Sequence, residues 1–205
     1  MIIKVCGMRE ADNIREVEAL GIDLMGFIFW PKSKRYVAEP PQYLPTQVKK
    51  VGVFVDATLE DIRQHIQDYQ LDIIQLHGHE TPAFAQAMRP AVIIKAFNIA
   101  TAEDLTQTKP YEGIVDYFLF DTKAQLPGGS GEQFDWSVLS HYEGTTPFLL
   151  SGGIGPDDAE RIKLLLTSNL SPLTSKCVGI DLNSRFEMAP ALKDVNQLRE
   201  FILKL

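Results

Sequence analysis

The sequence feature that most constrains the fold is a regular alternation of short apolar, β-prone runs with helical patterns. Eight runs qualify as strands: Ile2–Cys6, Leu24–Phe29, Val51–Val55, Ile73–His77, Val92–Ala96, Tyr117–Asp121, Phe148–Ser151 and Cys177–Asp181. Most of them are apolar continuously rather than at every second residue, as expected when both faces of a parallel sheet are covered. The alternation therefore predicts an α/β protein with a parallel sheet.

The segments between these runs carry helix signals. Apolar residues with the spacing of one helix face are Leu59, Ile62, Ile66 and Tyr69 in an early segment, and Val195, Leu198, Ile202 and Leu205 in the last one. Thr58 begins a capping signal before the first set, and Asp194 is suited to cap the second. Pro156 fits the first turn of a helix that follows the Ser151-Gly-Gly loop.

Two folds contain eight strands that alternate with helices: a closed (β/α)8 barrel and an open doubly wound sheet. The open sheet is expected to carry G-x-G-x-x-G after its first strand, whereas the residues there are Cys6-Gly7-Met8-Arg9. Barrels of this kind typically have about 250 residues, so a chain of 205 residues is a compact example. We therefore predict a single (β/α)8 TIM barrel domain over residues 1–205.

Composition and charge exclude several classes of partner. The formal net charge is −7, whereas nucleic-acid binders hold the phosphate backbone with clusters of Lys and Arg. No run approaches the roughly 20 apolar residues of a membrane span. The apolar start of the chain is too short for a signal peptide and is interrupted by Lys4. We expect neither nucleic acid nor a membrane as a partner, although local amides and cations can still hold a small anion.

Cysteine usage indicates the compartment. The chain has two cysteines, Cys6 and Cys177, with no CxxC and no metal-ligand spacing. Because a soluble protein of this size can fold without a disulfide, a reducing compartment is the simpler interpretation. We expect a cytoplasmic protein with no metal site.

The carboxyl ends of the predicted strands carry reactive side chains. These ends share one mouth in a parallel barrel, and they supply Cys6, His77, Asp121, Ser151 and Asp181. A lone cysteine is more often a small buried hydrophobe, and His77 is more often a structural hydrogen-bonding residue, which leaves it as a candidate to line the site. Asp121 has the stronger case, because a carboxylate after the apolar run 118–120 is costly unless it is hydrogen-bonded or at the open mouth. A helix cap or an ion pair with Lys123 would also explain it.

Two loops are candidates for anion binding. In Ser151-Gly152-Gly153, glycines before a helix allow backbone amides to approach a phosphate, and the loops after strands seven and eight form the usual phosphate site of such barrels. The alternative is a tight turn that needs positive φ. Arg35, directly after the second strand, suits bidentate binding of a carboxylate, although a basic loop is normally only solvated surface.

Together these residues resemble the phosphoribosylanthranilate isomerase family along nearly the whole chain. The matching stretches are Lys4-Val-Cys-Gly7, Gly26-Phe-Ile-Phe29, Pro31-Lys-Ser-Lys-Arg-Tyr36, Val51-Gly-Val-Phe-Val55, Gln75-Leu-His-Gly78, Asp121-Thr-Lys123, Gly128-Gly-Ser-Gly131, Phe134-Asp-Trp136 and Ser151-Gly-Gly153. Several motifs in the right order, each at a strand end, are far more specific than any one of them.

The resemblance implies an isomerase of tryptophan biosynthesis. Its reaction would be an Amadori rearrangement of N-(5-phosphoribosyl)anthranilate to 1-(2-carboxyphenylamino)-1-deoxyribulose 5-phosphate, without metal or organic cofactor. By the family pattern, Asp121 is the general acid that opens the furanose ring, and Cys6 is the general base that removes the C2 proton. Arg35 would hold the anthranilate carboxylate, and Gly152 and Gly153 the phosphate.

The sequence departs from the family after the eighth strand. Where the family has Ser-Ser-Gly-Val-Glu, this chain has Asn183-Ser184-Arg185-Phe186-Glu187 after Asp181-Leu. The loss of glycine at position 185 removes the freest backbone approach to a phosphate. We predict that Arg185 replaces it with a charged contact, with an outward-pointing arginine as the alternative. Asp181, Ser184 and Arg185 are therefore included in the predicted substrate site.

Two other functions are open at this point. One is a related aminoaldose phosphate isomerase, whose chemistry uses paired carboxylates and whose ligand carries two phosphates; Cys6 and a single phosphate loop argue against it. The other is a barrel that only binds phosphorylated ligands, which Cys6, Asp121 and Arg35 together disfavour. We expect a monomer, with a homodimer as the alternative.

Overall fold

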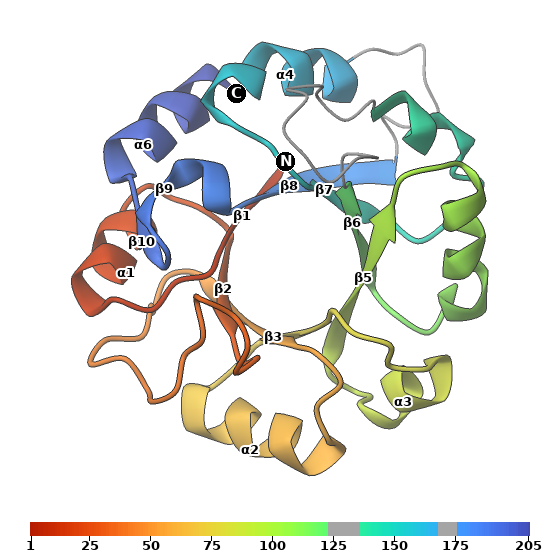
Figure 1. Ribbon diagram of the computed structural model, residues 1–205, viewed down its shortest axis with the longest axis horizontal. Coiled ribbons are helices and arrows are strands. Elements are labelled where there is room, and N and C mark those ends of the chain that lie inside the picture. The colour runs from red at the N-terminus through yellow and green to blue at the C-terminus, as the bar shows by residue number, and fades with distance from the viewer. Residues whose placement is uncertain (123–135, 168–175) are drawn as a thin grey trace.

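The computed structural model describes residues 1–122, 136–167 and 176–205. Eight parallel strands close into one barrel in chain order, from β1 to β8 (Figure 1). The strands are β1 Ile2–Cys6, β2 Leu24–Ile28, β3 Lys49–Phe54, β4 Ile73–Leu76, β5 Val92–Ile99, β6 Tyr117–Thr122, β7 Phe148–Ser151 and β8 Cys177–Leu182. The predicted (β/α)8 barrel is confirmed, and each predicted strand is present to within a few residues of its expected ends.

Helices and short 3-10 segments surround the barrel (Figure 1). They are α1 Ala11–Glu18, α2 Leu59–Tyr69, α3 Pro82–Ala87, η1 Glu103–Tyr111, η2 Trp136–His141, η3 Pro156–Asp158, α4 Ala159–Thr167, η4 Ser184–Phe186 and α6 Val195–Lys204. Between η4 and α6, β9 Glu187–Ala189 and β10 Leu192–Lys193 form an antiparallel pair. The motif residues from Lys123 to Asp135 lie outside the described residues, as does the segment 168–175.

The predicted helix caps are confirmed. Thr58 Oγ1 accepts a hydrogen bond from Asp61 N at 3.1 Å, and Asp194 Oδ1 accepts one from Gln197 N at 3.0 Å. Each cap satisfies a backbone N–H that has no partner within its own helix. Pro156 is the first residue of η3, where its missing N–H costs nothing.

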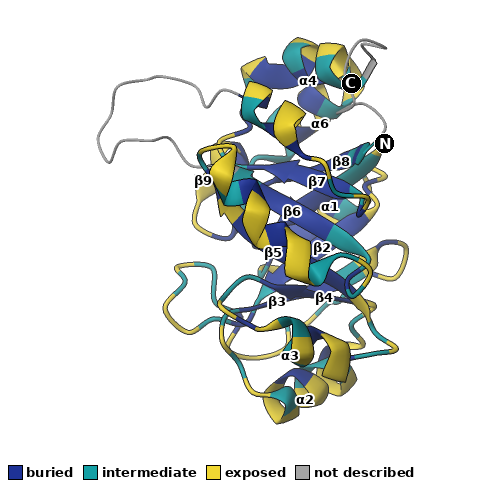
Figure 2. Ribbon diagram, turned by 90° about the vertical axis from the view of Figure 1, so that its right-hand side faces the viewer, coloured by how far each residue is buried: buried dark blue, intermediate teal, exposed yellow. Residues whose placement is uncertain are grey.

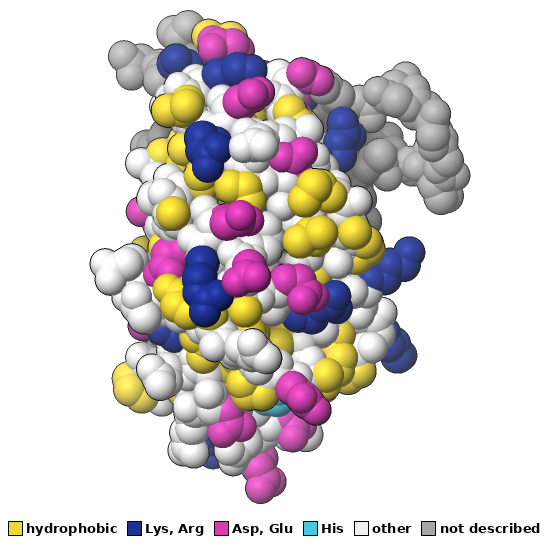
Figure 3. Space-filling model, turned by 90° about the vertical axis from the view of Figure 1, so that its left-hand side faces the viewer, with side chains coloured by type: hydrophobic (Ala, Val, Ile, Leu, Met, Phe, Trp, Pro, Cys, Tyr) yellow, Lys and Arg dark blue, Asp and Glu magenta, His cyan; other side chains and the backbone are white. Residues whose placement is uncertain are grey.

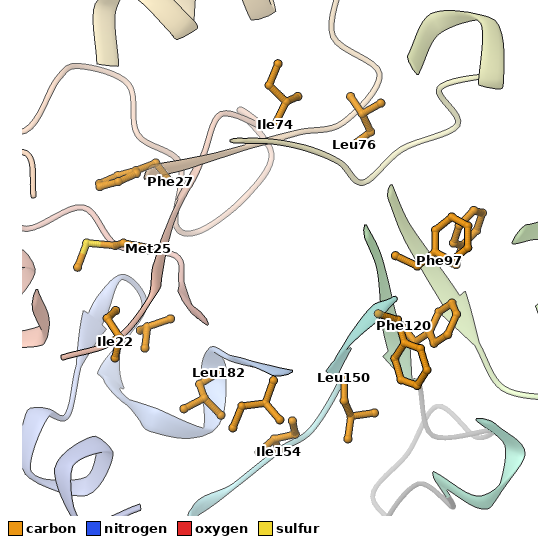
Figure 4. Packing of buried hydrophobic residues seen from close by; sticks show 14 of the residues in the cluster. Ile22, Met25, Phe27, Ile74, Leu76, Phe97, Phe120, Leu150, Ile154 and Leu182 are labelled. Carbon is orange, nitrogen blue, oxygen red and sulfur yellow. The ribbon is translucent and has the colours of Figure 1, made fainter. Parts of the chain in front are cut away.

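The apolar core has two layers. The larger layer lies between strands and helices, where side chains such as Met25, Phe27 and Leu150 point away from the barrel axis (Figure 4). The smaller layer fills the barrel interior and comprises Leu24, Val51, Ile73, Ile94, Ala96, Leu119 and Leu149. Burial follows the strands, while exposed residues lie on the outer faces of the helices (Figure 2). This inner layer makes the barrel a packed core rather than a pore, and the functional sites of such barrels lie at the carboxyl ends of the strands.

A polar layer lies above this apolar layer, towards the carboxyl ends of the strands. The strand register pairs Lys4 with Asp181, and Asp121 with Ser151. Side chains at these paired positions lie at one level of the barrel because neighbouring parallel strands keep their alternation in step. The fold thus brings residues that are far apart in the sequence to one mouth.

The outer surface shows no sorting of charge on the face drawn in Figure 3. There, the described Lys and Arg side chains are interspersed with Asp and Glu. Such a mixture is unlike the one-signed basic surface of nucleic-acid binders. Among the described helices, none combines the length and apolarity needed to span a bilayer.

Candidate active site

Cys6 ends β1 inside the barrel mouth, where only 3% of its surface is exposed. Its register partner on β2 is Gly26, and a Cβ added to Gly26 would lie 2.7 Å from Cys6 Sγ. The missing side chain at Gly26 is therefore what makes room for the thiol. Burial raises the pKa of Cys6 above its ordinary value, and the nearby charge of Lys4 offsets this only in part.

A buried ion pair interacts with the thiol. Lys4 Nζ is 2.9 Å from Asp181 Oδ1, and the Lys4 side chain is fully buried. Ser151 Oγ donates to the second oxygen of Asp181 at 3.3 Å. Burial alone would lower the pKa of Lys4, but the attraction of Asp181 and Cys6 more than offsets it, and the pKa is raised. Lys4 is therefore an ammonium ion, and both oxygens of Asp181 already have partners in the protein.

Asp121 and His77 face each other at the mouth. His77 Nε2 is 3.6 Å from Asp121 Oδ2, and each side chain is a little under one-third exposed. Gln75 Nε2 lies 3.0 Å from His77 Nδ1. Gln75 thus contacts one ring nitrogen of His77, while the other ring nitrogen faces Asp121. His77 and Asp121 therefore lie next to each other at the carboxyl ends of β4 and β6.

A second buried ion pair holds the loop after His77. Lys95 Nζ is 3.2 Å from Glu80 Oε2, and both side chains are nearly inaccessible. Gly78 N donates to Glu80 Oε2 at 3.0 Å, while Lys95 Nζ donates to Gly78 O at 2.7 Å. Both polar groups of Gly78 are thus fixed by one ion pair, which restrains the backbone next to His77.

Arg35 has a protein partner that the sequence did not reveal. Its guanidinium binds Glu187 with Nε at 2.8 Å from Oε1 and Nη2 at 2.6 Å from Oε2. The buried Lys193 Nζ donates to the same carboxylate at 2.6 Å and to Asn183 Oδ1 at 2.8 Å. Burial alone would raise the pKa of Glu187, but the hydrogen bonds from Arg35 and Lys193 lower it. Glu187 is therefore an anion that holds Arg35 beside the mouth.

The predicted phosphate loop forms a tight turn that needs glycine. Gly152 and Gly153 have φ values of +86° and +70°, a region that residues with a Cβ rarely adopt. A Cβ on Gly155 would lie 3.3 Å from Arg185 Nη2. Arg185, in η4 after β8, therefore lies beside the loop that follows β7. Ser184, which begins η4, is exposed next to it.

The comparisons with known proteins agree along the whole chain. Residues 3–204 match the family described as N-(5'phosphoribosyl)anthranilate (PRA) isomerase. The chain belongs to this family. The N-(5'-phosphoribosyl)anthranilate isomerase of Parabacteroides distasonis is 50% identical over 216 residues, with coverage of 100% of this chain and 93% of the relative.

Solved structures of the family share the fold. The phosphoribosyl anthranilate isomerase of Thermotoga maritima has a TM-score of 0.83 at 30% identity, covering 100% of this chain and 98% of that one. Another phosphoribosyl anthranilate isomerase, solved with reduced 1-(o-carboxyphenylamino)-1-deoxyribulose 5-phosphate, has a TM-score of 0.79 at 27% identity, with the same coverage. The sequence therefore places the chain in the isomerase family, and the structure shows that it has the (β/α)8 barrel of that family.

The structure also adds residues that the sequence analysis did not include in the site. The sequence did contain a signal that Lys4 belongs to the site. Residues two apart on a strand point to the same side, so Lys4 shares the inner face of the first strand with Cys6. Gln75 gave the same signal, because it lies two residues before His77 in the predicted strand Ile73–His77, whereas Lys193 and Glu187 lie after the eighth strand and gave none. Within residues 1–122, 136–167 and 176–205, no group of three or more His, Cys, Asp or Glu side chains is placed to hold a metal ion.

Gly7 links the first strand to Arg35, and Gly7→Ala is expected to harm both stability and substrate binding. Gly7 has φ +78°, and a Cβ there would lie 2.5 Å from Arg35 Cδ and 2.9 Å from Asn183 Oδ1. The backbone strain alone should cost about 1–3 kcal/mol, and the clash should displace the guanidinium. Urea denaturation and KM for the family substrate measure the two effects.

Gly21→Ala is the matched control for this prediction. Gly21 has φ +75°, but nothing lies within 4 Å of the added Cβ, so this variant carries the backbone strain without the clash. We expect Gly7→Ala to be the less stable variant and the only one of the two with a raised KM. Equal stability and equal KM in both would contradict the packing of Arg35 against Gly7.

Proposed function

We propose that this chain isomerises N-(5-phosphoribosyl)anthranilate to 1-(2-carboxyphenylamino)-1-deoxyribulose 5-phosphate in tryptophan biosynthesis, using Asp121 as general acid and Cys6 as general base. The observation that carries the proposal is that a thiol and a carboxyl group lie at one barrel mouth in a chain that matches the isomerase family over residues 3–204. The reaction needs one proton delivered and another removed, and no redox step.

In the first half of the reaction the sugar ring opens. Asp121 gives a proton to the furanose oxygen as the bond from that oxygen to C1 breaks, and the nitrogen lone pair forms the C1=N bond of a protonated Schiff base. Support for this role comes from the position of Asp121 at the open end of β6, where its side chain is 28% exposed and can reach a ligand. The adjacent His77 fixes the direction of the carboxyl group.

In the second half, a carbon acid is deprotonated. The Cys6 thiolate removes the proton from C2, and the electron pair of that C–H bond forms the C1=C2 bond of an enolamine while nitrogen regains its lone pair. The enolamine then becomes the ketone by moving the C2 hydroxyl proton to C1. A thiol acts as a base only in its thiolate form, so the cations near Cys6 support this role.

The substrate carries an anion at each end, and the mouth offers a cationic or amide group for each. The loop at Gly152 and Gly153, with Ser184 and Arg185 beside it, would receive the phosphate, and Arg35 the carboxylate. A ligand held at both ends presents its sugar to Cys6 and Asp121. Ser151 and Asp181 complete the wall below the sugar, and His77 lines it above.

The remaining expectations form part of this proposal. The chain would act as one domain over residues 1–205, as a monomer in the cytoplasm, without a metal or organic cofactor. The two proposed proton transfers ask for no residue from a second copy, so a monomer would be sufficient for the reaction. Size-exclusion chromatography with light scattering measures this, with a homodimer as the contrary result.

Substrate choice tests the proposed function against its nearest rival. The purified protein is incubated separately with phosphoribosylanthranilate and with the doubly phosphorylated aminoaldose of histidine biosynthesis, and each product is identified by mass spectrometry and chromatography. We expect turnover of the first substrate only. Turnover of the second alone would replace the proposal, and turnover of neither would favour a barrel that only binds phosphorylated ligands.

Arg35→Ala is expected to raise KM by roughly 10- to 150-fold, because a hydrogen bond to a charged group contributes about 1.5–3 kcal/mol. The effect on kcat should be smaller, since the guanidinium binds away from the two proton transfers. Glu187 keeps Lys193 as a partner in this variant, so no carboxylate is left unpaired. Steady-state kinetics measure both constants. Lys34→Ala, at an exposed position in the same loop, should leave both constants unchanged; equal kinetics for the two variants would contradict the role of Arg35.

Arg185→Ala is expected to weaken binding of a phosphate-bearing product analogue by roughly 10- to 150-fold, the same range as for other charge-assisted contacts. The reason is the position of its guanidinium over Gly155, at the loop after β7. Isothermal titration calorimetry measures the affinity. Arg63→Ala, an exposed arginine on α2, serves as a control of equal charge. Equal affinity for the Arg185 variant and the wild type would mean that Arg185 has no part in phosphate binding.

A further inference from the structure

Lys4 is a charged residue in the interior of the barrel. It is fully buried on the inner face of β1, two residues before Cys6, and therefore on the same side of the strand. Two residues of a strand span roughly 6–7 Å. A buried lysine is costly unless it is paired, and an apolar side chain would fill the same space. Asp181 supplies that partner, and the charge of Lys4 thereby lies on the same inner face as the Cys6 thiol.

In the described part of the chain, four charged side chains interact with the thiol, and a fifth, Glu187, is bound to two of these four. The cations are Lys4 on β1, Arg35 after β2 and Lys193 on β10, and the carboxylates are Asp181 on β8 and Glu187 on β9. Lys4 is paired with Asp181, and Glu187 is shared by Arg35 and Lys193. Because three cations meet only two carboxylates, the cluster has room for one more negative charge. Within the cluster, the Cys6 thiolate is the group that can supply it.

The two members of the buried pair act on the thiol in opposite directions. Burial raises the pKa of Cys6; the charge of Lys4 lowers it, the charge of Asp181 raises it, and the charge of Lys193 lowers it again, in decreasing order of size. The charge of Lys4 therefore lowers the pKa of Cys6 by more than the charge of Asp181 raises it. The net effect of the pair on the thiol is therefore the difference between two opposed charges, with that of Lys4 the larger.

We propose that Lys4 is a positioning residue of the isomerase reaction: its buried ammonium stabilises the Cys6 thiolate, and Asp181 holds that ammonium in place and limits its effect on the thiol. The inference rests on the proposed role of Cys6 as general base. It assigns Asp181 an electrostatic role through Lys4 in addition to its place in the wall of the substrate site. The chemistry of the step is unchanged: the thiolate takes the C2 proton, and Lys4 transfers no proton itself.

The test measures the acidity of Cys6 without substrate. In a Cys177→Ser background, Cys6 is the one cysteine of the chain, and the rate of its alkylation by iodoacetamide, followed by mass spectrometry across pH, gives its pKa. Lys4→Met removes the cation at similar length, and Asp181→Asn removes the carboxylate at the same size. The Lys4→Met/Asp181→Asn double variant leaves no unpaired buried charge, and so it is expected to fold even if a single variant does not.

We expect the pKa of Cys6 to be lowest in Asp181→Asn, higher in the wild type, higher again in the double variant, and highest in Lys4→Met. The single variants should differ from wild type by about 1–3 pH units in opposite directions. In turnover, the rise of kcat/KM with pH should move to higher pH in Lys4→Met and to lower pH in Asp181→Asn. A double variant with a Cys6 pKa at or below the wild-type value, or folded single variants that shift it in the same direction, would overturn the inference.

The proposed function and this inference can fail separately. If Cys6→Ser keeps wild-type turnover, Cys6 is not the base, yet the order of thiol pKa values still shows whether Lys4 controls the thiol. If Cys6→Ser is inactive but the variants do not show the expected order of thiol pKa values, Cys6 is still the general base and Lys4 has only a structural role.

Discussion

Replacement of Cys6 by serine is expected to lower kcat/KM for phosphoribosylanthranilate by roughly 10²–10⁴-fold, the usual contribution of a general base. A hydroxyl group is a far weaker base than a thiol near neutral pH, while its volume is close to that of the thiol. Gly26 leaves room for the thiol, because a Cβ added to Gly26 would lie 2.7 Å from Cys6 Sγ. The smaller serine oxygen fits the same space without rearrangement. Stopped-flow or steady-state kinetics with substrate generated in situ measure the loss.

The control for this prediction is Cys177→Ser. Cys177 is buried in β8, where its Sγ lies 3.6 Å from Gly179 O, and it takes no part in the proposed reaction. Its variant should keep wild-type turnover, and both serine variants should keep the wild-type circular dichroism spectrum. A Cys6→Ser protein that turns over substrate at the wild-type rate would remove Cys6 from the mechanism.

Replacement of Asp121 by asparagine is expected to have an effect of similar size, roughly 10²–10⁴-fold on kcat/KM, because the amide cannot donate an acidic proton to the ring oxygen. The change keeps the shape of the side chain and its contact with His77, so binding should change much less than kcat. A fall in kcat with little change in KM indicates a lost proton transfer, whereas a rise in KM with little change in kcat indicates lost binding.

Asp68→Asn is a matched control for Asp121→Asn. Asp68 is an exposed carboxylate on α2 that accepts a hydrogen bond from Gln64, and its variant should keep both constants. If Asp121→Asn raises KM strongly while kcat stays near the wild-type value, Asp121 is a binding residue, and another group must open the ring.

Local patterns in the sequence were sufficient to predict most of the fold. Continuous apolar runs placed all eight strands, because strands buried on both faces select such runs. Thr58 and Asp194 marked helix starts, because side-chain oxygens satisfy free backbone N–H groups there. The strand ends then placed Cys6, Asp121 and Ser151 at one mouth, since all strands of a parallel barrel end on the same side.

The contacts between the site residues could not be predicted in this way. Arg35 and Glu187 are 152 positions apart, and Lys4 and Asp181 are 177 apart. Such pairs depend on barrel closure, which brings β1 against β8, and on the β9–β10 pair that follows it. The resemblance assigned Arg35 to a ligand carboxylate but gave no sign that a carboxylate of the protein already binds it.

Isomerase activity is measured by the loss of phosphoribosylanthranilate fluorescence after purified protein is added to substrate formed in situ. With the wild-type chain, we expect a rapid decay that is proportional to protein concentration and yields the deoxyribulose phosphate product. The same amount of Cys6→Ser or Asp121→Asn should leave the decay close to the rate without protein. Folded wild-type protein that leaves the fluorescence decaying at that same uncatalysed rate would contradict the account.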